Sequence, residues 1–278
     1  MAVVELTSDP TGLYLKAALG LLPVPRRPEA LPDREIARRG LIIDRDHLAR
    51  YDRVCGFRLS DTLPATYVHV LAFPLAMTLM SASDFPFPVV GLVHVANRIT
   101  VRRPVDATQR IDLLVRAENL RSHDRGRVFD VVATAFADDE NVWTGVSTYL
   151  SKNAPKGDAS AKRDHPPMPA PTALWKMPAR VGSDYAEVSG DHNPIHTSRI
   201  GARLFGFPRP IAHGMWSKAR ALAALEGRLP AAYTVDVAFK QPILLPARVG
   251  FSAAARTDGW EFRLDSKRPH LAGLVTPP

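Results

Sequence analysis

The stretch SGDHNPIH at residues 189–196 gathers an aspartate, an asparagine, a proline and two histidines into eight positions. Gly190 favours a positive φ that ends a helical turn, and Pro194 disfavours the α conformation in the residue before it. We therefore predict a bent loop that brings Asp191 and His196 to one face, whereas a continuous helix would point their side chains apart. Such a pair can share proton transfers, because histidine titrates near neutrality and neighbours shift the pKa of a buried carboxylate.

The composition is that of an ordinary globular chain. Its 278 residues are 46% hydrophobic, which is enough for one large domain or two ordinary ones with a buried core. The apolar stretch at 12–23 contains Lys16 and is shorter than the roughly 20 residues of a membrane span. Acidic residues precede it where a secretory signal carries positive charge. A single cysteine excludes a disulfide framework or a multi-cysteine metal site. We expect a cytoplasmic protein without a membrane span, metal or cofactor.

The formal net charge of +8 favours an acidic partner. Lysine and arginine are spread along the chain and are not clustered with aromatic residues, so a nucleic-acid groove is not indicated. Phosphorylated cofactors and acidic carrier proteins fit the charge equally well. An ordinary basic, solvated surface also accounts for it.

The clearest break in composition is KNAPKGDASAKRDHPPMPAP at 152–171. Proline, alanine and charge without apolar periodicity indicate a linker. We therefore divide the chain into an N-terminal extension at 1–40, a first half at 41–151 and a second half at 172–278.

The two halves end in strands that repeat at a constant offset. Superposing Pro104 on Pro242 gives 242 − 104 = 138, and the same offset places Ile111 on Val249. Each segment has the pattern of a strand, a proline-marked bend and a second strand with alternating apolar residues. The repeat predicts two similar antiparallel sheets.

One helical stretch precedes the strands in each half. In the second half we predict a helix that begins near Gly214 and ends by Gly227. In the first half we predict a short helix at Pro74–Met80, with the proline in its first turn. One helix followed by antiparallel strands, present twice, predicts an α+β architecture in which each sheet wraps its own helix.

The segment YAEVSGDHNPIHTSRIGARLFGFPRPIAHGM at 185–215 resembles the signature of the MaoC-like, or (R)-specific enoyl-thioester hydratase, family. That family has the hot-dog fold, in which a curved antiparallel sheet wraps a long central helix. The two halves are similar to its double hot-dog members, whose first half is degenerate. The resemblance implies a hydro-lyase of fatty-acid metabolism, which hydrates trans-2-enoyl thioesters or dehydrates (R)-3-hydroxyacyl thioesters.

The resemblance also implies roles for three residues. Hydration needs a base that activates water, an acid that protonates carbon 2 and a donor for the enolate oxygen. Asp191 and His196 are expected to share the first two tasks, and which of them moves which proton stays open. The backbone N–H of Gly214, at the start of the central helix, is the expected oxyanion donor because a helix N-terminus favours negative charge.

Three more residues are expected to support the catalytic pair. Asn193 would position the pair or the water. His213 matches the family pattern, and we expect from it a structural hydrogen bond before the helix. Ser189 is expected to cap and pack.

The first half lacks the reactive groups of the second. Laying Tyr51 on Tyr185 gives 185 − 51 = 134, aligns YDRVCG with YAEVSG, and places Phe57 at Asp191. The same offset places a threonine at the position of the catalytic histidine. The first half is therefore expected to be non-catalytic.

The helices of the two halves can be aligned in two ways. Matching FPL at 73–75 to HGM places Pro74 at Gly214, and proline has no N–H to donate. Matching His69 to His213 instead places Val70 there. A short first-half helix, followed by SASDFPFPVV, would open space for a longer acyl chain; the alternative is that this half only completes the sheet.

The expected partner is an acyl thioester of coenzyme A or of acyl carrier protein, which share the same phosphopantetheine arm. The chain is expected to be a monomeric pseudo-dimer or a homodimer. Two other functions remain open, a hot-dog acyl thioesterase and a non-catalytic acyl-thioester-binding protein.

Overall fold

The computed structural model describes residues 2–7, 27–152 and 170–278. Their strands form one sheet in the order β1-β2-β4-β5-β6-β3-β8-β11-β10-β9-β7. The first six strands in the chain are β1 (Ala2–Glu5), β2 (Arg34–Leu41), β3 (Val93–Val101), β4 (Ile111–His123), β5 (Gly126–Ala137) and β6 (Glu140–Ser151). The others are β7 (Ala173–Met177), β8 (Tyr233–Phe239), β9 (Ala247–Arg256), β10 (Gly259–Asp265) and β11 (Pro269–Thr276).

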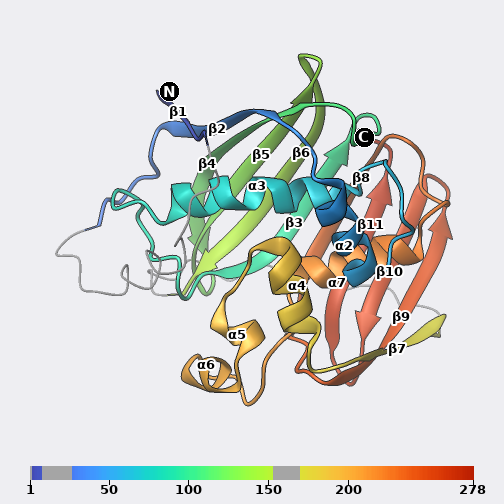
Figure 1. The fold of residues 1–278 in the computed structure, drawn as a ribbon. Coiled ribbons are helices and arrows are strands. Elements are labelled where there is room, and N and C mark those ends of the chain that lie inside the picture. The colour runs from blue at the N-terminus through green and yellow to red at the C-terminus, as the bar shows by residue number, and fades with distance from the viewer. Residues whose placement is uncertain (1, 8–26, 153–169) are drawn as a thin grey trace.

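Two central helices, α3 (Ala65–Met80) and α7 (Gly214–Ala224), cross the face of this sheet (Figure 1). Helix α3 lies over the first-half strands and α7 over the second-half strands. The described helices are α2 (Arg45–Cys55), α3 (Ala65–Met80), α4 (Val181–Ser189), α5 (Pro194–Thr197), α6 (Arg199–Leu204) and α7 (Gly214–Ala224). None of these helices is long and apolar enough to cross a membrane.

The two expected sheets are joined edge to edge through β3 and β8, which pair antiparallel. The Arg98 guanidinium on β3 donates to the Asp236 carboxylate on β8 at 2.9 Å. Beneath this junction the ammonium of Lys218, on α7, is 0% exposed and donates to the backbone oxygens of Asn97 and Val235 and to the Asn97 side chain. The lysine therefore ties α7 to one strand of each half.

The strand repeat predicted from the sequence is confirmed. Strands β3 and β8 end at Val101 and Phe239, and 239 − 101 = 138. In each half a strand that precedes the helices also joins the sheet, because β2 pairs with β4 as β7 pairs with β9. Strand β7 is an edge strand, whereas β2 lies between β1 and β4. The first-half sheet therefore includes residues 34–41, and the predicted boundary at residue 41 falls at the end of a strand. Of the predicted linker, residues 153–169 lie outside the described residues.

The predicted start of the second-half helix at Gly214 is confirmed, but the prediction for the first half is wrong. Helix α3 begins at Ala65, and Pro74 lies inside it. Most of α3 is buried, and this packing holds the helix together across a proline that removes one backbone hydrogen bond. At 16 residues α3 is longer than α7, which has 11, so the first-half helix is not short.

The segments before the two central helices, α3 and α7, differ in length. Gly56 and Gly190 end α2 and α4 with φ of 81° and 71°, and they keep the predicted offset of 134. From these glycines to the start of the next central helix there are 65 − 56 = 9 positions in the first half and 214 − 190 = 24 in the second. The fifteen extra residues form the loop that contains α5 and α6.

This insertion overturns both predicted helix alignments. The isolated bridge of Thr62 with Asp106 corresponds to that of Ile211 with Leu244, which makes Ala65 the counterpart of Gly214. Neither Pro74 nor Val70 occupies that position. An alignment without a gap cannot represent the inserted loop.

Candidate active site

Hydrogen bonds between residues two apart in the sequence fix the loop that follows α4. The Ser189 hydroxyl accepts from the N–H of Asp191 at 3.2 Å, and the Asp191 carboxylate accepts from the N–H of Asn193 at 3.2 Å. The Asn193 side chain then accepts from the N–H of Ile195 at 3.3 Å and so caps α5, which begins at Pro194. Ser189 and Asn193 therefore hold the backbone on both sides of Asp191.

The imidazole of His196 has a defined orientation and tautomer. Its Nδ1 lies 2.7 Å from the backbone oxygen of Ile211. Because a carbonyl only accepts, Nδ1 carries the hydrogen and Nε2 keeps its lone pair. The backbone of His196 packs on Gly182, where an added Cβ would lie 2.0 Å from the His196 oxygen. Close packing of the loop on α4 therefore requires glycine at position 182.

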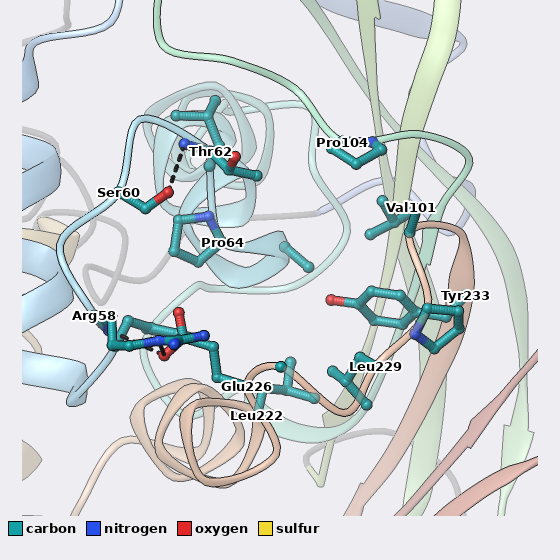
Figure 2. Close-up of a pocket in the computed structure, with 16 residues that line it drawn as sticks. Arg58, Ser60, Thr62, Pro64, Val101, Pro104, Leu222, Glu226, Leu229 and Tyr233 are labelled. Atoms are coloured by element: carbon teal, nitrogen blue, oxygen red, sulfur yellow. Dashed lines mark hydrogen bonds and ion pairs between the residues drawn. The ribbon is translucent and has the colours of Figure 1, made fainter.

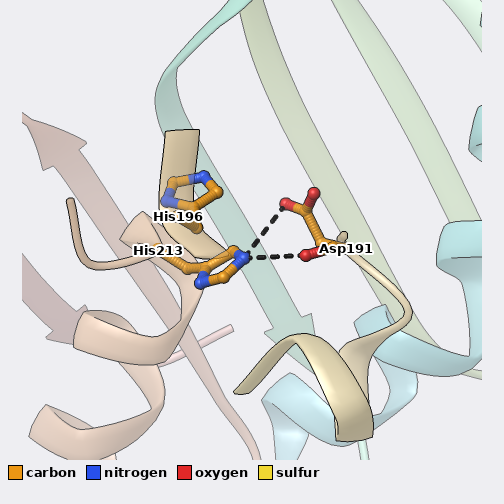
Figure 3. Close-up of side chains that lie close together, drawn as sticks. All are labelled: Asp191, His196 and His213. Carbon is orange, nitrogen blue, oxygen red and sulfur yellow. Dashed lines mark hydrogen bonds and ion pairs between the residues drawn. The ribbon is translucent and has the colours of Figure 1, made fainter. Parts of the chain in front are cut away.

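His213 joins the two ends of the loop (Figure 3). Its side chain is 2% exposed, and its Nε2 donates to the backbone oxygen of Asp191 at 3.0 Å. The same nitrogen lies 3.7 Å from the Asp191 carboxylate, and the ring stacks on that of His196 with centroids 3.7 Å apart. His213 therefore contacts both members of the predicted pair, and it forms the structural hydrogen bond expected from the sequence.

Both imidazoles are neutral at neutral pH. Burial lowers the pKa of His196, while the Asp191 carboxylate and the Ile211 carbonyl oppose that shift. Burial, with His196 acting in the same direction, lowers the pKa of His213 to about 3. His196 is thus ready to accept a proton at Nε2, and the nearby carboxylate would stabilise the resulting cation.

Gly214 lies at the open tip of α7. The N-cap residue His213 makes no side-chain hydrogen bond to the helix, and the first N–H groups of a helix have no acceptor within it. A Cβ at Gly214 would lie 3.0 Å from the Phe239 ring. Glycine therefore allows Phe239 to pack closely against this tip, where the helix N-terminus carries a partial positive charge.

The three side chains form a compact cluster. One polar atom each of Asp191, His196 and His213 lies within 4.8 Å of the others, which is a spacing from which a metal ion can be held. In the described arrangement His213 Nε2 is already engaged as a donor to the Asp191 backbone. The two histidines therefore donate hydrogen bonds to backbone oxygens, from His213 to Asp191 and from His196 to Ile211.

The first half adds residues that the sequence did not single out for the site. Burial lowers the pKa of His69 to about 4 and that of His94 to about 3, and it raises the pKa of Tyr149. The Asp191 charge acts on all three groups and raises each pKa. The His94 ring lies against Phe239 and Tyr149, with centroids 5.0 and 4.7 Å away. No local pattern indicates these contacts, because they arise from the joining of two distant segments.

The counterpart of this site in the first half is a cavity of about 190 Å³ at the start of α3. Figure 2 shows Pro64 from the first half across from Leu222 and Tyr233 from the second. An ion pair between Arg58 and Glu226, at 3.3 Å, lies at its edge.

The residues that lead into this cavity cannot form a carboxylate–imidazole pair. Residues 57–64 contain no histidine, and their only acidic residue, Asp61, pairs with Arg45 at 3.0 Å. The inserted loop of the second half has no counterpart here.

Comparison with known proteins identifies the family. Residues 176–261 match the model of the MaoC like domain. Over 277 residues the chain is 40% identical to 3-hydroxyacyl-thioester dehydratase X of Mycobacterium tuberculosis, covering 96% of this chain and 99% of that protein. The chain belongs to the MaoC-like dehydratase family.

Solved structures agree with this assignment to the MaoC-like dehydratases. The crystal structure of HtdX of M. tuberculosis matches with a TM-score of 0.80 and 38% identity, over 88% of this chain and 100% of that one. A MaoC-like dehydratase from Phytophthora capsici matches with a TM-score of 0.71 over 88% of this chain and 95% of that one; at 18% identity it shows the fold alone. The family resemblance and the α+β hot-dog fold expected from the sequence are confirmed.

Proposed function

We propose that the chain is an (R)-specific hydro-lyase that dehydrates (R)-3-hydroxyacyl thioesters and hydrates trans-2-enoyl thioesters. The observation that carries this proposal is the neutral His196, with a free Nε2 lone pair, beside the Asp191 carboxylate in a loop that leads to the open tip of α7. The name of the M. tuberculosis relative, a 3-hydroxyacyl-thioester dehydratase, supports the same chemistry.

In the dehydration direction the pair accepts the proton from carbon 2 while the thioester oxygen takes up negative charge at the Gly214 N–H. The C3–O bond then breaks, the double bond forms, and the proton is delivered to the leaving hydroxyl to give water. The pair gains one proton from carbon 2 and gives one proton to the leaving hydroxyl, so it returns to its starting charge. His213, which holds the Asp191 backbone and stacks on His196, acts as a positioning residue.

The direct test follows the conjugated enoyl double bond by its absorbance. Addition of a trans-2-enoyl thioester to the full chain is expected to lower this absorbance without releasing free thiol. Thiol release would instead indicate a thioesterase, and the absence of both signals in the presence of binding would indicate a non-catalytic acyl-thioester-binding protein. Analysis of the product on a chiral column is expected to give the (R)-3-hydroxyacyl thioester.

We further propose that the acyl chain lies against first-half residues. The rings of Phe239, His94, Tyr149 and Phe129 follow one another with centroid separations of 5.0, 4.7 and 5.8 Å. The row leads from the tip of α7 into the core, where Phe129 is 0% exposed. The same assay with acyl chains of increasing length is expected to show a limit where the chain meets this closed end.

The short first-half helix that was expected to open space for a longer acyl chain is not present. Helix α3 is long, and Phe85 and Phe87 from SASDFPFPVV are buried against Phe129. This segment therefore fills the core and does not open it.

The pH dependence follows from the lowered pKa of His196. If the neutral imidazole is the reactive form, kcat/KM is expected to be level near neutral pH and to fall as the pH drops below 6.5, the ordinary value for histidine. The measurement is kcat/KM for the enoyl thioester against pH. An acid limb centred at pH 7 or above would contradict a neutral, buried His196.

Acid unfolding must be separated from this effect. His69, His94 and His213 stay neutral in the fold, with pKa values of about 4, about 3 and about 3. Unfolded histidines bind protons near pH 6.5, so the unfolded state binds more protons and stability falls as the pH drops below that value. Rates are therefore compared only at pH values where far-UV circular dichroism is unchanged.

A further inference from the structure

Helix α6 and the residue after it present three exposed apolar side chains. Ile200 is 75% exposed, Leu204 is 79% exposed and Phe205 is 40% exposed. Single exposed apolar residues are common on proteins, but three on one short element form a patch. We refer to Ile200, Leu204 and Phe205 as the α6 ridge.

Arginines border the α6 ridge. Arg199, Arg203 and Arg209 are all exposed, and none of them forms an ion pair with another residue in the described part of the chain. Residues four apart lie on the same side of a helix, so Arg199 and Arg203 form a basic stripe beside the apolar stripe of Ile200 and Leu204. The surface of α6 thus carries an apolar stripe and, next to it, a positively charged stripe.

The ridge lies close to the candidate active site in the chain and in space. Ser198 ends α5, which carries His196, and it also caps α6 through its hydroxyl. Figure 1 shows α5 and α6 together at one end of the molecule, away from the strands of the sheet. A partner bound to α6 would therefore stand beside the catalytic loop.

We propose that the α6 ridge and its arginines bind an acidic, amphipathic helix of an acyl carrier protein, which presents the thioester substrate on its flexible arm. This inference rests on the proposed function and names the form in which the substrate arrives. Apolar side chains of the carrier helix would cover Ile200 and Leu204, and its carboxylates would pair with Arg199 and Arg203. The net charge of +8 would attract such an acidic partner over a distance.

Other occupants fit the surface less well. A second copy of this chain placed symmetrically on the ridge would bring the arginines of one copy toward those of the other. Coenzyme A offers phosphates for the arginines but has no extended apolar face for Ile200 and Leu204. The proposal therefore commits to a carrier protein.

The experiment compares the same acyl group on two carriers. Crotonyl thioesters of coenzyme A and of a bacterial acyl carrier protein are assayed with the full chain and two double variants, Ile200→Ser with Leu204→Ser, and Arg199→Glu with Arg203→Glu. The matched control combines Leu174→Ser with Lys176→Glu on β7, where Leu174 is 81% exposed and Lys176 is also exposed. Binding of the fluorescently labelled carrier protein is measured separately by anisotropy.

Each α6 variant is expected to lower kcat/KM for the carrier-protein substrate by about tenfold or more and to leave the coenzyme A substrate within about twofold. The β7 control is expected to change neither. Equal losses of kcat/KM with both substrates would show that the arginines bind phosphate groups of coenzyme A. Unchanged kcat/KM with both substrates would show that the α6 ridge is not a docking surface. Either result overturns the proposal.

The anisotropy measurement keeps this inference distinct from the proposed function. Carrier binding that is lost in the α6 variants supports the ridge even if no double bond is consumed, and that combination would reject the proposed chemistry alone. Conversely, turnover of both substrates without any effect of the α6 variants rejects the ridge alone. Sedimentation of the chain with anionic lipid vesicles, but no binding of the carrier, would assign the ridge to a membrane surface and also overturn the proposal.

Discussion

Replacing Asp191 with asparagine is expected to lower kcat for the enoyl thioester by roughly 10²–10⁴-fold, the range typical for loss of a positioned acid–base group. Asparagine keeps the shape of the side chain and can still accept from the N–H of Asn193, as the carboxylate does at 3.2 Å. It removes the negative charge that faces His196 and His213. The loss should therefore appear in the chemical step, with little change in thermal stability.

The matched control is Asp184→Asn on the neighbouring helix α4. Asp184 forms an ion pair with Arg180 at 3.0 Å on the surface, so its removal is expected to leave kcat unchanged. Absorbance assays and thermal unfolding of both variants separate catalysis from folding. Asp191→Asn activity within about threefold of the original chain would contradict the assignment of this carboxylate.

A double variant tests whether Asp191 and His196 act as one unit. Groups that serve the same step are strongly non-additive, because removing either one already disables it. Asp191→Asn combined with His196→Ala is therefore expected to be little slower than the slower of the two single variants. Multiplied losses would indicate independent roles.

Replacing Lys218 with methionine is expected to destabilise the fold by about 2–4 kcal/mol. The lysine Nζ donates to the Asn97 side chain at 2.6 Å, to the Asn97 backbone at 3.0 Å and to the Val235 backbone at 3.2 Å. These three acceptors match the three N–H donors of an ammonium group. Burial lowers the pKa of Lys218 and so opposes the charged form, whereas the three acceptors favour it. Methionine fills the space but leaves these buried oxygens without their donor.

Urea unfolding followed by circular dichroism measures this loss. The control is Lys240→Met, which alters an exposed lysine just after β8 and is expected to leave the midpoint unchanged. Adding Asn97→Leu to Lys218→Met removes the strongest orphaned acceptor and is expected to recover part of the stability. Equal midpoints for Lys218→Met and Lys240→Met would show that the buried lysine contributes nothing.

The loop at residues 189–196 was predictable because its conformation is set locally. Gly190 adopts the expected positive φ of 71°, and Pro194 begins α5 with Asn193 outside the α region. Gly214 begins α7 as expected. Glycine and proline restrict or free the backbone at single residues, so their effect can be read without knowing the rest of the fold.

The first-half helix was not predictable in the same way. Pro74 fits the first turn of a helix by itself, but burial of nearly the whole of α3 favours a helix that runs through it. The Thr78 hydroxyl donates to the Pro74 oxygen at 2.8 Å within the helix. Tertiary packing therefore decided where this helix begins.

The remaining parts of the site depend on distant segments. His94 lies against Phe239 of β8 only because β3 joins β8, and no spacing in the sequence indicates that contact. The α6 ridge was hidden for another reason. Ile200 and Leu204 have the ordinary spacing of a buried helix face, but in the folded chain both are exposed to solvent.

The hydrogen bonds between β3 and β8 join two edges that belong to one polypeptide. If the two halves were separate subunits, the same edges would pair only at protein concentrations above the dissociation constant, and the joined sheet would separate on dilution. Within a single chain the local concentration of one edge around the other is fixed by the covalent tether. The pairing of β3 with β8 therefore does not depend on the concentration of the protein.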